Sequence, residues 1–363
     1  MTTEKNSANR NFANSNPLPG VDLFKYICAF FVAFVHLHLL ENEAPAASFW
    51  LLQYVCRLAV PYFFVAGGYL LFRNTAPQNF SMEKPLKYVK KTLRIYLIWT
   101  AIYFIPTLAY QIIPSQQRGR TLLFWLRDVV FVGGYTHLWY LNATIFAVLA
   151  ISLLLKAKWS IKRILVLSGL LYCVGLTGQA YFVVWTPIRE NLPALWNVLD
   201  NFKWIIPTTR CGLFEAFFLM TIGLALAVNP PKLSLSKTSI LFAVSMGIWA
   251  AEVWLTNSRG WNNAQDMYIF MIPSVILFFW ISVLLPLKER PIYRELRESS
   301  MLIYYIHLFL FVCSKKLFTA VFGSTPNTIL RFVMIMGATY VLVLIIKKLS
   351  HTEKFRWLSI LYK

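Results

Sequence analysis

The sequence predicts an all-α, multi-pass membrane protein with about ten transmembrane helices and both termini in the cytoplasm. Three observations predict this fold class: 58% of the 363 residues are hydrophobic, only 14% are charged, and long apolar runs follow one another along the chain. Soluble globular proteins carry about 25% charged residues, which argues against a soluble multidomain protein. The 13 Trp, 18 Tyr and 29 Phe suit lipid-facing surfaces and aromatic belts at both membrane interfaces.

Each predicted span is a mostly apolar run near the length of about 17–25 residues that crosses a bilayer. The runs are Val21–Leu40, Phe49–Phe72, Leu93–Ile113, His137–Leu155, Ile164–Trp185, Thr209–Val228, Thr238–Leu255, Met267–Leu285, Ser300–Phe318 and Thr328–Ile346. The stretch Thr121–Val132 is shorter and contains Arg127 and Asp128, which favours an interfacial or re-entrant helix.

The formal net charge of +20 indicates topology rather than nucleic-acid binding. Nucleic-acid binding would gather Lys and Arg on one water-facing surface, whereas here they form short clusters between the apolar runs. The clusters are Arg73–Arg94, Lys156–Arg163, Lys232–Lys237, Lys288–Arg297 and Lys347–Lys363. The alternate loops are poorer in these residues, and Glu41–Ser48 contains none. The positive-inside rule therefore places the basic loops and both termini in the cytoplasm.

The domain organisation follows from this pattern. Residues 1–20 are polar and lack the apolar core of a signal peptide, which predicts a disordered cytoplasmic tail. Residues 21–346 form the membrane domain, and residues 347–363 form a basic cytoplasmic tail. The connecting loops are too short to hold a soluble domain. The five cysteines lie in or beside apolar runs without a CxxC pair, so we expect packing roles and no metal site.

The first span carries ionisable residues, each of which costs several kcal/mol inside a membrane. Lys25 and His36 are eleven residues apart, which is about 20° from three full turns and about 16 Å along a helix. One helix face thus presents a cation near the cytoplasm and an imidazole deeper in the membrane. A snorkelling lysine and a hydrogen-bonded core histidine remain alternatives. His38, close to Glu41, is predicted to be interfacial.

Other spans add polar residues that favour a shared cavity. Arg57 needs an acceptor, water or an anion, and Pro61, shortly after it, removes one backbone hydrogen bond. Glu215 is the simplest ion-pair partner for Arg57 or Arg210. Trp139 and Tyr140 would be ordinary belt aromatics if they lay at an interface. The residues concerned are Arg57 in the second span, Trp139 and Tyr140 in the fourth, Arg210 and Glu215 in the sixth, and His307 in the ninth.

Four motifs occur in order along these spans. They are Asp22…Lys25-x10-His36, Arg57…Val60-Pro61-Tyr-Phe63-Phe64…Gly68-Tyr69, His137-Leu-Trp139-Tyr140 and Ile303-Tyr304-Tyr305-Ile306-His307. Together they resemble the acyltransferase-3 family, the ten-helix membrane O-acyltransferases that modify bacterial surface polysaccharides. The helix-one motif of that family begins with Arg, whereas this chain has Lys25, which keeps the charge but lacks the bidentate guanidinium.

The resemblance implies an activity at a bacterial inner or plasma membrane. An acyl group, usually acetyl, would pass from cytoplasmic acyl-CoA to a hydroxyl of an envelope glycan, without a metal. Lys25 and Arg57 would bind acyl-CoA, and His36 would act as general base or transient acyl carrier. The residues that would bind substrate are Trp139, Tyr140, Arg210, Glu215 and His307.

Two alternatives remain open from the sequence. Some members of the family form the membrane half of a resistance-associated serine racemase, so a carrier or binding protein for a small polar solute such as an amino acid is the second hypothesis. A polysaccharide exporter is the third. The sequence does not fix the acceptor, the acyl chain or the oligomeric state, a homo-oligomer included.

Overall fold

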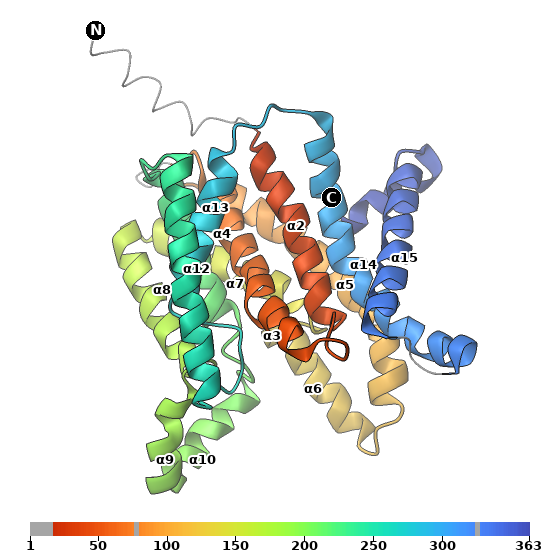
Figure 1. The fold of residues 1–363 in the computed structure, drawn as a ribbon, viewed down its shortest axis with the longest axis horizontal. Coiled ribbons are helices and arrows are strands. Elements are labelled where there is room, and N and C mark those ends of the chain that lie inside the picture. Colours follow the sequence, from red (N-terminus) through yellow and green to blue (C-terminus); the bar gives the residue numbers. More distant parts are fainter. Residues whose placement is uncertain (1–16, 76–79, 324–326) are drawn as a thin grey trace.

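The computed structural model describes residues 17–75, 80–323 and 327–363, and every regular element within them is a helix. This confirms the all-helical class (Figure 1). The helices are α2 Pro19–His36, α3 Pro45–Gln53, α4 Ala59–Phe72, α5 Glu83–Thr107, α6 Arg118–Phe131, α7 Trp139–Lys156, α8 Ile161–Leu176, α9 Thr186–Asn191, α10 Pro193–Asn201, α11 Phe217–Val228, α12 Leu235–Ser258, α13 Met271–Leu284, α14 Pro291–Phe322 and α15 Thr328–Ser350. Most of the predicted N-terminal tail lies outside the described residues.

Each predicted span overlaps a helix, and the described residues contain seven helical segments long and apolar enough to cross a membrane. These are Pro19–His36, Pro45–Phe72, Glu83–Ile112, Trp139–Lys156, Leu235–Ser258, Pro291–Ser314 and Thr328–Ser350. Two shorter apolar helices are Gly212–Val228 and Met271–Leu284. The chain is thus a multi-pass membrane protein. The count of ten spans and the cytoplasmic orientation stay predictions.

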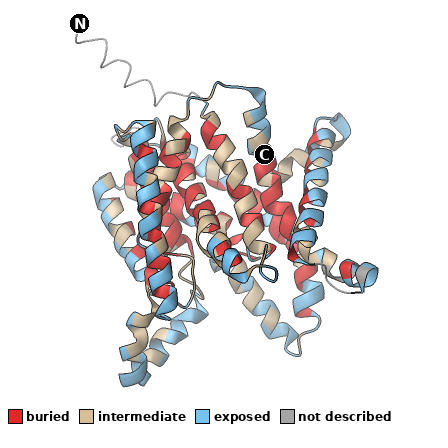
Figure 2. Ribbon diagram, viewed as in Figure 1, coloured by how far each residue is buried: buried red, intermediate tan, exposed pale blue. Residues whose placement is uncertain are grey.

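The bundle is centred on α2, which packs against α4, α13 and α14. Buried residues gather on these central helices, whereas α12 and α15 expose much of their outer surface (Figure 2). Exposed apolar side chains on outer faces are expected where lipid replaces water. The helices α6, α9 and α10 lie at the opposite end of the bundle from the start of α2 (Figure 1).

Small residues allow α4 and α11 to cross closely, as the Gly67-Gly68 pair predicts. A Cβ added to Gly68 would lie 2.2 Å from the backbone oxygen of Met220, and one added to Gly223 would lie 2.2 Å from that of Val65. The two backbones therefore touch without intervening side chains.

Gly68→Ala is consequently expected to lower the midpoint of thermal unfolding in detergent, because the backbones must separate to admit one methyl group; overpacking of this kind costs about 1–3 kcal/mol. Gly247→Ala on α12 is the matched control, since a Cβ there meets nothing within 4 Å. Equal midpoints for both variants would contradict the close crossing.

Several helix boundaries differ from the predicted span ends. The first helix ends at His36 rather than Leu40, because His38 and Leu40 adopt left-handed backbone angles, with φ of 55° and 64°. The second span is broken at Tyr54 and continues through a 3₁₀ turn, Val55–Leu58, into α4. Pro61 is not the cause, since it lies in the first turn of α4, where no intrahelical hydrogen bond is lost.

Other differences concern later spans. The fifth helix ends at Leu176 rather than Trp185. The sixth begins at Gly212 with a π-helical turn, so Arg210 precedes it instead of lying inside it. The eighth begins at Met271 rather than Met267. Beyond α15, the segment Glu353–Leu361 is a 3₁₀ helix whose Leu361 carbonyl accepts a hydrogen bond from Trp99 Nε1 at 3.0 Å.

Candidate functional site

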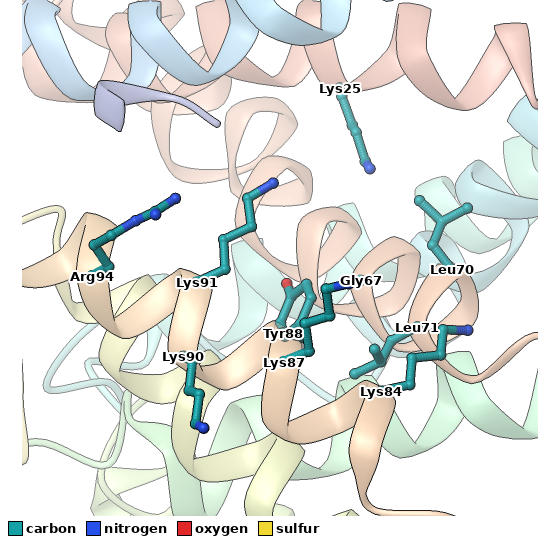
Figure 3. Close-up of a pocket in the computed structure, with 10 residues that line it drawn as sticks. All are labelled: Lys25, Gly67, Leu70, Leu71, Lys84, Lys87, Tyr88, Lys90, Lys91 and Arg94. Atoms are coloured by element: carbon teal, nitrogen blue, oxygen red, sulfur yellow. The ribbon is translucent and has the colours of Figure 1, made fainter. Parts of the chain in front are cut away.

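A basic cavity of about 740 Å³ lies between α2, α4 and α5. Its lining consists of Lys25, Gly67, Leu70, Leu71, Lys84, Lys87, Tyr88, Lys90, Lys91 and Arg94 (Figure 3). Six of these ten residues are cationic and none is acidic. The spacing of residues 84, 87, 91 and 94 puts their side chains on one face of α5, and Lys25 extends from α2 toward that face (Figure 3). The cavity is suited to an anion with several negative charges.

The acid one turn before Lys25 is already paired. Asp22 accepts a hydrogen bond from Arg297 Nη1 at 3.1 Å. Within the described residues, no carboxylate lies within ion-pair distance of Lys25. The ammonium group is therefore available to an anion that enters the cavity.

An apolar cavity of about 290 Å³ adjoins the basic cavity, and both are lined by Lys25, Gly67, Tyr88 and Lys91. Its far end is formed by three aromatic rings, Phe63, Tyr140 and Tyr304. Ring centroids are 5.8 Å apart for Phe63 and Tyr140 and 6.0 Å apart for Tyr140 and Tyr304. The Tyr304 hydroxyl donates to the backbone carbonyl of His137. This contact links the end of the apolar cavity to a cluster of histidines.

Three histidines from separate elements lie together. Ring centroids are 6.2 Å apart for His36 and His137, 5.6 Å for His36 and His307, and 5.9 Å for His137 and His307. The Nδ1 atom of His307 lies 2.8 Å from the Ile303 carbonyl, which it contacts as a donor. Its Nε2 atom is buried without a hydrogen-bond partner among the described residues. That atom can therefore serve as a proton acceptor beside His36. Within the described residues, no group of His, Cys, Asp and Glu could hold a metal ion.

His36 lines a small inner cavity of about 50 Å³. Its other polar lining residues are Arg57, Arg210, Glu215 and Asp266, together with Trp139. The Arg210 guanidinium lies over the Trp139 ring, 4.9 Å from its centroid. Five of the predicted site residues are thus brought together in one cavity. Tyr140 lines the apolar cavity, His307 lies beside His36, and Lys25 lines the basic cavity.

The ion-pair partner of both arginines is Asp266, which corrects the assignment to Glu215. Arg57 Nη1 and Arg210 Nη1 both donate to Asp266 Oδ1, the latter at 3.1 Å. Arg57 Nε also donates to Gln53 at 3.0 Å. Burial works to raise the pKa of Asp266, but the guanidinium groups of Arg210 and Arg57 outweigh it and lower that pKa. Glu215 is buried in the same cavity without an ion pair to a described residue.

Asp266 was missed by the sequence reasoning, although it lies one residue before the predicted start of the eighth span. The signal that could have identified it was the combination of two arginines that need an acceptor and an acid at the end of a predicted span. Its loop is held by Glu252, whose carboxylate accepts the backbone N–H groups of Ile269 and Phe270 at 2.7 and 2.8 Å. A carboxylate at the start of a helix is stabilised by these N–H groups and by the helix dipole.

The family model of an acyltransferase domain, acyltransferase-3, matches residues 18–348. This range includes every residue of the three cavities. The chain belongs to the acyltransferase-3 family. Membership identifies a membrane acyltransferase domain and confirms the resemblance drawn from the four motifs.

Similar curated proteins carry racemase names. A serine/alanine racemase of Enterococcus gallinarum is 27% identical over 342 residues, which are 92% of this chain and 46% of that protein. An amino-acid racemase of Enterococcus faecalis is 28% identical over 338 residues, 91% of this chain and 46% of that protein. The chain thus spans less than half the length of these relatives. No solved structure matches it.

Proposed function

We propose that the protein transfers an acyl group, acetyl in the first instance, from cytoplasmic acyl-CoA to a hydroxyl of a cell-envelope glycan. In this proposal the chain crosses a bacterial inner membrane ten times, with both termini and the basic cavity on the cytoplasmic side. One observation carries the proposal: the apolar cavity that adjoins the cluster of six cations is lined by Tyr304, which contacts His137 in the histidine cluster that includes His36.

The proposal assigns the parts of acyl-CoA to the cavities in order. The phosphates of CoA would bind the lysines of α5 and Lys25, because a cavity lined by six cationic residues and no acidic residue favours a polyanion. The pantetheine arm, which is uncharged, would follow the apolar cavity. Its reach is similar to the distance of about 16 Å between residues 25 and 36 along a helix. The thioester would then lie near His36.

The chemistry follows from the inner cavity. His36 would take the proton of the acceptor hydroxyl as its oxygen attacks the thioester carbonyl. The C–S bond then breaks, and the CoA thiolate leaves and recovers the proton from the imidazolium. Arg57 or Arg210 would stabilise the negative charge that develops on the carbonyl oxygen. Asp266 holds both guanidinium groups at this cavity.

The most direct test is mass spectrometry of envelope glycans from cells with and without the gene. We expect a fraction of the glycan to lose the mass of one acetyl group in the deletion strain and to regain it on complementation. Unchanged glycans, together with no release of thiol from acetyl-CoA by the purified protein in nanodiscs, would refute the proposal.

Lys25→Ala is expected to weaken acetyl-CoA binding by about 10- to 100-fold, because one charge-assisted hydrogen bond to a phosphate is lost. Lys25→Arg should restore binding, since it keeps the charge and adds a bidentate donor. Equilibrium binding to protein in nanodiscs measures both. The matched control is Lys237→Ala, an exposed lysine at the start of α12. An equal loss in the control would indicate a general surface-charge effect instead.

A second candidate function is favoured by the racemase names of the relatives: carriage or binding of a small polar solute such as an amino acid. Uptake of labelled serine into proteoliposomes distinguishes the two. Uptake that survives His36→Ala, in a protein that does not bind acetyl-CoA, would favour the carrier.

A further inference from the structure

A fourth cavity, which we call the outer cavity, adjoins the inner cavity and shares no lining residue with the basic cavity. It has a volume of about 240 Å³. The π-helical turn Leu108–Ile112 after α5, the helix α6, the loop 132–136 and the start of α7 surround it. Both this cavity and the inner cavity are lined by Trp139 and Arg210. These two side chains therefore separate it from His36.

The walls of this outer cavity are fixed by hydrogen bonds to the backbone. Trp125 Nε1 donates to the Gly134 carbonyl at 2.9 Å, and the Gly134 N–H donates to the Tyr96 hydroxyl at 3.0 Å. Gly133 has a φ of 120°, and a Cβ there would lie 2.5 Å from the backbone of Trp139. The loop is thus tied to α5, α6 and α7, and the cavity is formed without a ligand.

Its polar groups come from separate elements. Gln111 lies in the π-helical turn Leu108–Ile112 that follows α5, Asp128 lies on α6, and Arg210 precedes the sixth span. The Asp128 carboxylate is oriented by Arg127, whose Nε and Nη2 donate to Oδ1 at 2.9 and 2.7 Å. Charge-assisted bonds of this kind hold a carboxylate in one geometry. The cavity therefore combines a positioned acid, an amide and a guanidinium with the rings of Trp125 and Tyr135.

We propose that the outer cavity is the acceptor subsite and binds one sugar residue of the acceptor. This rests on the proposed acyl transfer. Aromatic rings pack against the C–H faces of a sugar ring, while carboxylate, amide and guanidinium groups bond its hydroxyls. The volume is below the range of about 300–1,000 Å³ that buries a drug-sized ligand, so the cavity has room for about one sugar unit. In this assignment a hydroxyl of that unit faces His36 across the wall that Trp139 and Arg210 form between the two cavities.

The test uses simple glycosides and protein in nanodiscs with saturating acetyl-CoA. A panel of methyl glycosides of hexoses and N-acetylhexosamines is added, and CoA thiol release is measured. At least one glycoside is expected to accelerate release over the rate with water alone. Trp125→Ala and Asp128→Asn should raise the KM for that glycoside by about tenfold or more.

The matched controls are Trp254→Ala, an exposed Trp on α12 that is 62% exposed, and Asp200→Asn on α10, which pairs with Lys203. The glycoside KM of both controls should equal that of the wild type. Because Asp128→Asn conserves size and shape, it answers the question even where Trp125→Ala unfolds.

Three results would overturn the assignment. An unchanged glycoside KM in Asp128→Asn would show that the Asp128 carboxylate does not bind the glycoside. Acceleration of thiol release by L-serine and by no glycoside would show that the acceptor is an amino acid and not a sugar. Acetyl-CoA binding without acceleration by any glycoside would refute the sugar subsite and leave the donor half of the proposed function intact. Failure of the wild type to bind acetyl-CoA would instead refute the proposed function itself.

Discussion

His36→Ala is expected to lower the rate of acyl transfer by about 10²–10⁴-fold, the usual contribution of a positioned general base. The imidazole lines the inner cavity beside two guanidinium groups, and His307 lies 5.6 Å from it between ring centroids. Without His36, the acceptor hydroxyl would have to attack while still protonated. Steady-state kinetics of thiol release with a glycoside acceptor measure the loss, and the effect should fall mainly on kcat.

The chain provides a matched control for this variant. His38 is two residues further on, exposed, and paired with Glu41 at 3.1 Å. His38→Ala should retain wild-type kcat, because its ring lines none of the cavities. Full activity of His36→Ala would contradict both proposed roles. Acetylated His36 peptides, trapped by rapid acid quench and detected by mass spectrometry, would favour a transient acyl carrier over a general base.

Much of the fold could be predicted from local sequence. Apolar runs of helical length reflect a property of each segment, namely that its backbone must satisfy its own hydrogen bonds in lipid. The eleven-residue separation of Lys25 and His36 is likewise a local property of one helix. Both residues could therefore be assigned to one helix face. The polar residues of the other spans could be assigned to a shared cavity, because each of them is costly in lipid.

The breaks in the helices were not predictable in the same way. The 3₁₀ turn that carries Arg57 and the π-helical turn that carries Glu215 lie inside apolar runs whose composition does not change. Such turns are short local adjustments, often at functional sites, and depend on neighbouring helices. The left-handed backbone conformation at His38 was not predictable either, because that position holds neither Gly nor Asn.

Contacts between distant segments also could not be predicted from the sequence. Asp266 is 209 positions from Arg57 and 56 from Arg210, so only the packed bundle brings the three together. The sequence indicated that both arginines needed an acceptor, and it offered Glu215, which lies in the same predicted span as Arg210. The tertiary structure selected Asp266, which lies in a loop held by Glu252.

Asp266→Ala is expected to destabilise the protein by about 3–5 kcal/mol, because it leaves two largely buried guanidinium groups without their shared carboxylate. The side chain of Asp266 is only 16% exposed, and those of Arg57 and Arg210 are 18% and 28% exposed. Unfolding by denaturant in mixed micelles measures the change. Asp200→Ala is the control, since its pair with Lys203 is about half exposed and exposed pairs contribute about 0–1 kcal/mol.

The pH dependence separates loss of charge from loss of packing. The folded-state pKa of Asp266 is lowered below its usual value because Arg210 and Arg57 outweigh the opposing effect of burial. A lowered pKa stabilises the folded state above the unfolded pKa of about 3.9, and this stabilisation is lost as the pH falls through the folded pKa. The wild type should therefore exceed Asp266→Asn in stability by a constant amount from neutral pH down to about pH 5 and by less below about pH 4. A stability difference that does not change over this range would show that Asp266 acts through packing. The positive charges of Arg57 and Arg210 would then have to be compensated by another group.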